Sequence, residues 1–176
     1  MNKAGKLHVY YGEGKGKTTA ALGLALRAAG QGLSVVIVQF LKNTPCGELV
    51  QLARLPEITV LRGQEGSRFA FQMSEAEKTA SRQIHNDNLR RALALVAEGR
   101  CDLLILDEAL DACQLGLLDE DLLKEALFGQ PPALERVITG HKAIAWIVEA
   151  ADYVTEMVKH KHPYDQGLKA RKGIEF

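Results

Sequence analysis

The chain has 176 residues, of which 47% are apolar and 25% charged, a composition typical of an ordinary globular domain. Its 22 basic residues balance 22 acidic residues, so it lacks the positive field that favours binding to nucleic acid or to an anionic membrane. No apolar stretch approaches the roughly 20 residues that span a bilayer, and the first six residues carry no apolar signal core. We therefore expect one domain over residues 1–176, with no nucleic acid and no membrane among its partners.

Short apolar segments alternate with amphipathic segments along the chain, a pattern typical of an α/β fold with a mainly parallel sheet covered on both faces. The predicted strands are residues 7–11, 34–40, 58–61, 102–107, 136–139 and 153–157. The predicted helices are residues 18–29, 47–55, 74–97, 119–128 and 142–151, the third of them opened by a capping box at Ser74–Glu77. We expect Gly30 and Gly32 to cap the first helix, residues 62–73 to form a long functional loop, and the basic tail from Lys159 to lack regular structure.

The cysteines indicate the redox compartment. Cys46, Cys101 and Cys113 are odd in number and form no Cys-x-x-Cys pair, so neither a disulfide framework nor a zinc knuckle is predicted. A reducing cytoplasm is the location that fits best.

A glycine-rich segment lies between the first predicted strand and the first predicted helix. In this position it is typical of a phosphate-binding loop, whose backbone N–H groups turn inward and whose helix N-terminus adds partial positive charge. Lys17 is suited to reach two phosphates, and the hydroxyl of Thr18 is suited to bind Mg²⁺. The predicted nucleotide-binding residues of the loop are Gly12, Glu13, Gly14, Lys15, Gly16, Lys17, Thr18 and Thr19.

The loop departs from the strict template, which places a glycine five residues before Gly16, where this chain has Tyr11. Gly12 comes one residue late and Lys15 adds a cation, so the usual orientation of the nucleotide does not follow from the motif. Two alternatives are a turn that only joins strand to helix and a dinucleotide site. The latter fits less well, because the second strand ends in Phe40-Leu41-Lys42 without the acid that holds a ribose. The expected fold is a three-layer P-loop NTPase-like (RecA-like) α/β fold.

Two acids, Asp107 and Glu108, follow four apolar residues at the end of the fourth predicted strand. In a doubly wound sheet this end faces the ligand crevice beside the first strand, where one acid can hold Mg²⁺ opposite Thr18. The alternative is a pair of acids that stabilises the N-terminus of the following helix.

Several segments together resemble the ATP:corrinoid adenosyltransferases of the cobalamin pathway. The likeness covers nearly the whole chain in order, and its most specific part is the closing stretch, which a generic P-loop protein has no reason to carry. The matching segments are Gly12–Ala21, Ala25–Ala28, Val38–Lys42, Asp107–Glu108, Thr139–Gly140, Val154–Met157 and Lys161–Phe176.

The resemblance implies that the Co(I) centre of a reduced corrinoid attacks the ribose 5′ carbon of ATP and expels intact triphosphate, in adenosylcobalamin biosynthesis or salvage. It also implies a nucleotide that lies reversed in the loop, Mg²⁺, a reduced flavoprotein as electron donor, and a homodimer. For such a leaving group Lys15, Lys17 and Mg²⁺ would stabilise the departing charge, so Lys17 is placed among the catalytic residues.

The resemblance also assigns roles outside the phosphate loop. An aromatic pair that keeps the lower face of the corrinoid free of ligand matches Phe69 and Phe71, although some members have tryptophan at the second position. Two phenylalanines that pack in the core would look the same in sequence. Arg27 matches an arginine that contacts nucleotide, but it is equally well a surface arginine. His141 stands where the family often has arginine, which either weakens one nucleotide contact or supplies it when the imidazole is protonated.

The basic tail matches a lid over the active site, and its cations are Lys159, Lys161, Lys169, Arg171 and Lys172. Binding of nucleic-acid phosphates is the alternative for these cations, and it is disfavoured by the neutral overall charge. His160 and His162 have the spacing of a metal pair, but in a basic tail such residues are more often solvated.

Two functions of other classes stay open. A P-loop kinase or ATPase would attack the γ-phosphate and produce ADP, but we find no base or water-orienting residue for it. A non-catalytic module would bind nucleotide or corrinoid and turn over nothing.

Overall fold

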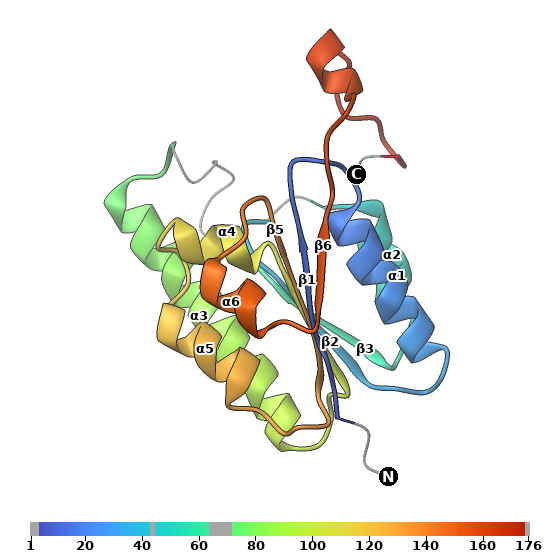
Figure 1. The fold of residues 1–176 in the computed structure, drawn as a ribbon, viewed down its shortest axis with the longest axis vertical. Helices are drawn as coiled ribbons and strands as arrows, with labels where there is room; N and C mark the ends of the chain where they lie inside the picture. Colours follow the sequence, from blue (N-terminus) through green and yellow to red (C-terminus); the bar gives the residue numbers. More distant parts are fainter. Residues whose placement is uncertain (1–3, 43–44, 64–71, 175–176) are drawn as a thin grey trace.

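A computed structural model describes residues 4–42, 45–63 and 72–174 (Figure 1). Its centre is a six-stranded sheet in the order β3-β2-β4-β5-β1-β6, with every neighbouring pair parallel. The strands are β1 (Leu7–Tyr11), β2 (Val35–Gln39), β3 (Ile58–Arg62), β4 (Leu103–Asp107), β5 (Glu135–Gly140) and β6 (Tyr153–Glu156). Every residue of β2 and β4 is buried, and every residue of β6 is exposed. Burial on both faces accounts for the mainly apolar sequences of β2 and β4. The exposure of β6 agrees with its position at one edge of the sheet.

Helices cover both faces of the sheet (Figure 1). The helices are α1 (Lys17–Ala29), α2 (Gly47–Leu52), α3 (Glu75–Ala97), α4 (Ala109–Gln114), α5 (Glu120–Phe128) and α6 (Ala145–Ala150). One apolar cluster joins α1 and Leu52 of α2 to one face of the central strands, and a second cluster joins α3, α4, α5 and Ile147 of α6 to the other face. The three-layer α/β fold expected from the sequence is therefore confirmed. None of the helices in the described part of the chain has the length and apolar character needed to span a membrane.

Most predicted elements are present within a few residues of their expected bounds. The capping box is confirmed, because the Ser74 hydroxyl accepts the N–H of Glu77 and the Glu77 carboxylate accepts the N–H of Ser74. Of the two glycines expected to cap α1, Gly32 has a left-handed φ of 75°, whereas Gly30 is right-handed at −64°. The predicted loop over 62–73 lies largely outside the described residues.

Three features of the structure were missing from the prediction or differ from it. Helix α4 was not predicted, because its six residues directly follow the acid pair and are too few to show a helical period. The tail contains a 3-10 helix, Pro163–Gln166, that starts at the proline and ends at the left-handed Gly167. The sheet order, which was not predicted, places β5 between β1 and the acid-bearing strand β4.

Candidate functional site

The phosphate loop lies at the carboxyl end of β1 and leads into the N-terminus of α1 (Figure 1). Its glycines are required by the backbone of the neighbouring strand, since a Cβ atom on Gly12 or Gly14 would lie 2.5 Å from the carbonyl oxygen of Met157. The N–H of Gly14 donates to that oxygen at 2.6 Å, and the N–H of Gly12 donates to the oxygen of His141 at 3.0 Å. The expectation that the loop glycines turn their N–H groups inward is therefore wrong for these two, whose N–H groups hold the loop against the ends of β5 and β6.

Lys17 is the first residue of α1, and its side chain reaches back across the loop. Its ammonium donates to the carbonyl oxygens of Gly12 at 2.6 Å and Gly14 at 2.9 Å. The loop thus keeps the ammonium at its own mouth, within reach of an anion that enters there.

Asp107 connects the loop to β4. Its side chain is 1% exposed, and its Oδ1 accepts the hydroxyls of Thr18 and Thr139, each at 2.9 Å. Its Oδ2 accepts the ammonium of Lys42 at 2.6 Å and the amide of Gln39 at 3.3 Å. The structure therefore brings Thr18 and Asp107 together, as the magnesium prediction requires. It does so although β5 lies between β1, which leads into the loop, and β4, which carries Asp107.

Glu108 follows in a left-handed conformation, with φ 63°. Its N–H donates to the Thr139 hydroxyl at 2.9 Å, and its carboxylate lies 3.3 Å from the ammonium of Lys42. Burial raises the pKa of Glu108, and the nearby charge of Lys42 works in the opposite direction. Glu108 is also the residue before α4, so the alternative of a helix N-terminal acid describes its position too.

Lys42 is a residue of the site that sequence reasoning missed. Its ammonium contacts Thr18, Asp107 and Glu108, at 3.0, 2.6 and 3.3 Å. Burial acts to lower the pKa of Lys42, but the charges of Asp107 and Glu108 outweigh it and the pKa is raised. The signal available in the sequence was a lysine just past the end of the second strand, at the same edge of the sheet as the loop.

Leu41 and His85 fix the position of Lys42. Leu41 has a left-handed φ of 55°, and its N–H donates to Nε2 of His85 at 3.4 Å. The His85 ring lies 2.9 Å from the oxygen of Leu117 through Nδ1 and packs edge-on against Phe40. Burial lowers the pKa of His85, so the ring is a neutral support that links α3 to the end of β2.

The oxygen atoms at this edge suit a hard cation such as Mg²⁺, since a hydroxyl and a carboxylate converge on one another. No group of three or more His, Cys, Asp or Glu side chains that could hold a metal occurs within the described ranges. A magnesium ion held by Thr18 and Asp107 or Glu108 would therefore take its remaining ligands from phosphate and water, which is the usual habit of this ion.

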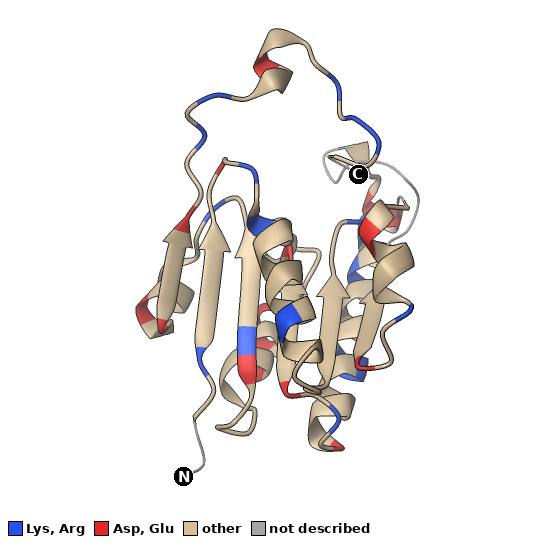
Figure 2. Ribbon diagram, turned by 90° about the vertical axis from the view of Figure 1, so that its right-hand side faces the viewer, with Lys and Arg blue, Asp and Glu red and all other residues tan. Residues whose placement is uncertain are grey.

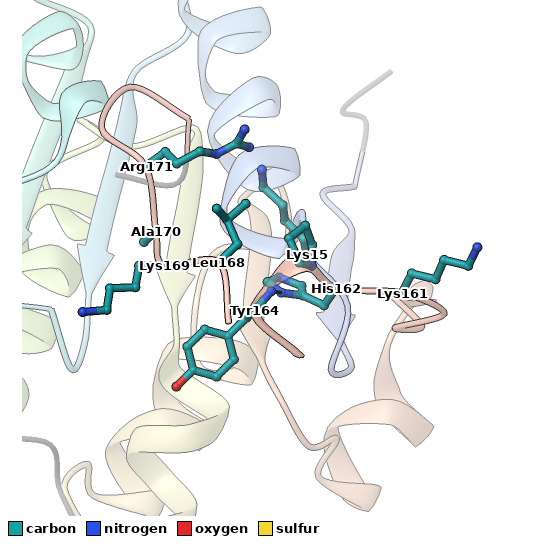
Figure 3. Close-up of a pocket in the computed structure, with 9 residues that line it drawn as sticks. Lys15, Lys161, His162, Tyr164, Leu168, Lys169, Ala170 and Arg171 are labelled. Atoms are coloured by element: carbon teal, nitrogen blue, oxygen red, sulfur yellow. Dashed lines mark hydrogen bonds between the residues drawn. The ribbon is translucent and has the colours of Figure 1, made fainter. Parts of the chain in front are cut away.

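The tail arches over the carboxyl ends of the strands and carries basic segments (Figure 2). Beneath it lies a cavity of about 250 Å³, in which Lys15 of the phosphate loop meets the tail (Figure 3). The ring of His162 accepts the N–H of Tyr164 at 3.2 Å, and Lys159 pairs with Asp165 at 3.1 Å. The cavity is lined by Lys15, Lys161, His162, Pro163, Tyr164, Leu168, Lys169, Ala170 and Arg171.

The remaining predicted site residues are more scattered. Arg27 is exposed in the last turn of α1, about 15 Å along the helix from Lys17 at 1.5 Å per residue, so the structure does not bring it to the loop. His141 is tied to α4, because its ring and its N–H both contact the carboxylate of Asp111. Phe69 and Phe71 lie outside the described residues.

Comparison with known proteins agrees with the resemblance seen in the sequence. Residues 3–176 match the family described as ATP:corrinoid adenosyltransferase BtuR/CobO/CobP. A protein of Pseudomonas aeruginosa named corrinoid adenosyltransferase is 34% identical over 176 residues, which cover 99% of this chain and 85% of that protein. Corrinoid adenosyltransferases of Escherichia coli K12 and Salmonella typhimurium are each 34% identical over 178 residues, which cover 100% of this chain and 88% of theirs.

Proposed function

Because the chain belongs to the ATP:corrinoid adenosyltransferase family and is a corrinoid adenosyltransferase, we propose that its phosphate loop holds the triphosphate of ATP as a leaving group. The observation that carries this proposal is the cavity shared by the phosphate loop and the basic tail, which is lined by Lys15 of the loop and by Lys161, Lys169 and Arg171 of the tail. An intact triphosphate needs more cationic contact than a single transferred phosphoryl group, because all of its charge leaves at once.

The proposed reaction forms one bond and breaks another. The lone pair of Co(I) attacks the 5′ carbon of ATP, the cobalt–carbon bond forms, and the carbon–oxygen bond gives its electron pair to triphosphate. Cobalt supplies the attacking electron pair and is formally oxidised from Co(I) to Co(III), so the reaction needs no nucleophilic side chain from the protein. Lys17 and Lys15 stabilise the departing charge, and Phe69 with Phe71 shapes the corrinoid side.

Magnesium is proposed at Thr18 and Asp107, with Glu108 as the neighbouring acid. When bound, it would supply positive charge to the phosphate oxygens as they leave. The support for this placement is the 2.9 Å hydrogen bond from the Thr18 hydroxyl to the Asp107 carboxylate, because it brings the oxygen atoms of both side chains together at the carboxyl edge of the sheet.

Three further parts of the proposal concern the setting of the reaction. A reduced flavoprotein supplies the electrons that make Co(I). The reaction takes place in the cytoplasm, where the free thiols of Cys46, Cys101 and Cys113 would stay reduced. The enzyme is a homodimer, and β6, with Tyr153 and Val154 exposed along a sheet edge, is a surface suited to pairing.

The test is anaerobic. The protein is mixed with Mg-ATP and chemically reduced cobalamin, the visible spectrum is followed, and the phosphate product is identified. We expect a light-sensitive alkylcobalamin and one equivalent of triphosphate, and Lys17→Ala should lower the rate by about a hundredfold or more. ADP as the product would support the rival that attacks the γ-phosphate, and bound nucleotide without turnover would support the non-catalytic module.

A further inference from the structure

Lys42 lies where a metal ion is expected. Its ammonium contacts the hydroxyl of Thr18 and the carboxylates of Asp107 and Glu108, which are the three side chains proposed for magnesium. The side chain of Lys42 is 23% exposed, and that of Asp107 is 1% exposed. One cation thus already neutralises part of a mostly buried pair of acids.

The surrounding chain holds Lys42 in this place from the backbone upward. Leu41 takes a left-handed conformation that side chains other than glycine rarely adopt, and it is bonded to the buried His85. Glu108, on the other side of the contact, is the second left-handed residue of this kind among the described residues. Unfavourable backbone conformations on both sides of one ion pair indicate a functional arrangement rather than an incidental surface contact.

A magnesium ion at Thr18 and Asp107 would meet the charge of Lys42 at contact distance. Like charges at such a distance repel, and the two negative charges of Asp107 and Glu108 do not balance the three positive charges of Mg²⁺ and Lys42. A triphosphate brings additional negative charge to the same edge, so it can take over either cation. Metal and nucleotide are therefore expected to arrive together.

We propose that Lys42 is the resident counter-ion of the magnesium site, which excludes free divalent cations until a triphosphate arrives and then moves from Asp107 to the phosphates. This inference rests on the proposed placement of magnesium at Thr18 and Asp107. It makes Lys42 a residue that couples metal binding to nucleotide binding.

The test measures binding of Mn²⁺, an EPR-visible substitute for Mg²⁺, to the full chain without nucleotide or corrinoid. We expect Lys42→Met to bind Mn²⁺ about tenfold or more tightly than the wild type, and Lys42→Met/Asp107→Asn to lose that gain. Lys124→Met is the matched control, because it removes a lysine that pairs with two carboxylates, Glu120 and Asp121, outside the site, and it should leave Mn²⁺ affinity unchanged. With inorganic triphosphate present, the order should reverse, so that the wild type binds Mn²⁺ more tightly than Lys42→Met.

Equal Mn²⁺ affinity of Lys42→Met and wild type would overturn the proposal, as would an equal gain in Lys124→Met, which would indicate a general field effect. If Lys42→Met does not fold by circular dichroism, Lys42→Gln gives the same comparison with a polar neutral side chain. Because no corrinoid is used, a failed metal test leaves adenosyl transfer standing, and failed adenosyl transfer does not change the metal result.

Discussion

Thr139 holds the two acids of the site in place. Its hydroxyl donates to Asp107 and accepts the N–H of Glu108, both at 2.9 Å, and its side chain is buried in β5 between the loop strand and the acid strand. Behind it, a Cβ atom on Gly140 would lie 2.5 Å from that of Leu110, so α4 packs directly against this strand end. Thr139 thus orients Asp107 and supports the left-handed Glu108, although it is not among the residues proposed to hold magnesium.

Replacing Thr139 by valine keeps the shape of the side chain and removes both hydrogen bonds. We expect the kcat/KM for adenosyl transfer to fall by about 10–100-fold, the usual effect of losing a partner that orients a metal ligand. The free energy of unfolding should fall by about 1–3 kcal/mol, because the N–H of Glu108 loses its acceptor. Steady-state assays and urea titrations measure the two effects.

The control for this change is Thr139→Ser, which keeps the hydroxyl and should retain most of the activity. Wild-type kcat/KM in Thr139→Val would contradict the orienting role. A loss of stability alone, with kcat/KM preserved, would leave Thr139 as a structural residue of β5.

At the scale of elements, Asp119 is the N-cap of α5 and connects this helix to α3. Its carboxylate accepts the N–H groups of Asp121 and Leu122, and it pairs with Arg82 of α3 at 3.0 Å. The bond from Arg82, followed by the two backbone N–H bonds, lowers the pKa of Asp119 below its ordinary value of 3.8. The residue therefore serves both as an N-cap and as a link between two helices of one layer.

Removing this cap in Asp119→Ala should lower the free energy of unfolding by about 1 kcal/mol at neutral pH. A lowered pKa means that the stabilisation is present above the ordinary range of a carboxyl group and is lost as the pH falls through the pKa of the folded state. The difference between wild type and variant should therefore shrink below about pH 4. Urea titrations over a series of pH values measure it.

Asp121→Ala is the control for Asp119→Ala, because Asp121 lies in the first turn of α5 but is not the residue that caps its N–H groups. Its side chain is 93% exposed, and Asp121→Ala should cost only a few tenths of a kcal/mol. If both variants lose the same free energy, the charge at the start of α5 matters more than the cap.

Most elements could be predicted because their signals are local. Alternating apolar runs, the Gly-Lys-Thr-Thr sequence and the capping box each act over a few residues and gave β1, α1, β4 and α3. The position of β5 between β1 and β4 depends on pairing between distant residues, which no local pattern encodes. The contact of Lys42 with Asp107 was missed for the same reason, and because it depends on a left-handed Leu41 that residue type does not suggest.

At the scale of the whole molecule, the tail is joined to the phosphate loop at Met157 and then crosses above it. Met157 pairs with the loop on both sides, because its N–H donates to Tyr11 and its oxygen accepts the N–H of Gly14. Beyond it, nearly all described residues are exposed, and three of the tail cations, Lys161, Lys169 and Arg171, are among the residues that line the cavity (Figure 3). The tail therefore contributes little to the core and lies where a bound substrate would be covered.

We expect removal of residues 159–176 to leave the melting temperature nearly unchanged, because the tail buries few apolar side chains. Adenosyl transfer should fall by about tenfold or more, because the cavity over the phosphate loop loses all its lining except Lys15.

A variant in which Lys161, Lys169 and Arg171 are replaced by glutamine separates the effect of the charge of the tail from the effect of its presence. Its matched control neutralises Arg90, Arg91 and Lys124, three exposed cations of α3 and α5. If only the tail variant loses rate, the tail acts through charge at the triphosphate or at the corrinoid periphery. If neither loses rate while the truncation does, the tail acts as a cover that excludes water from Co(I).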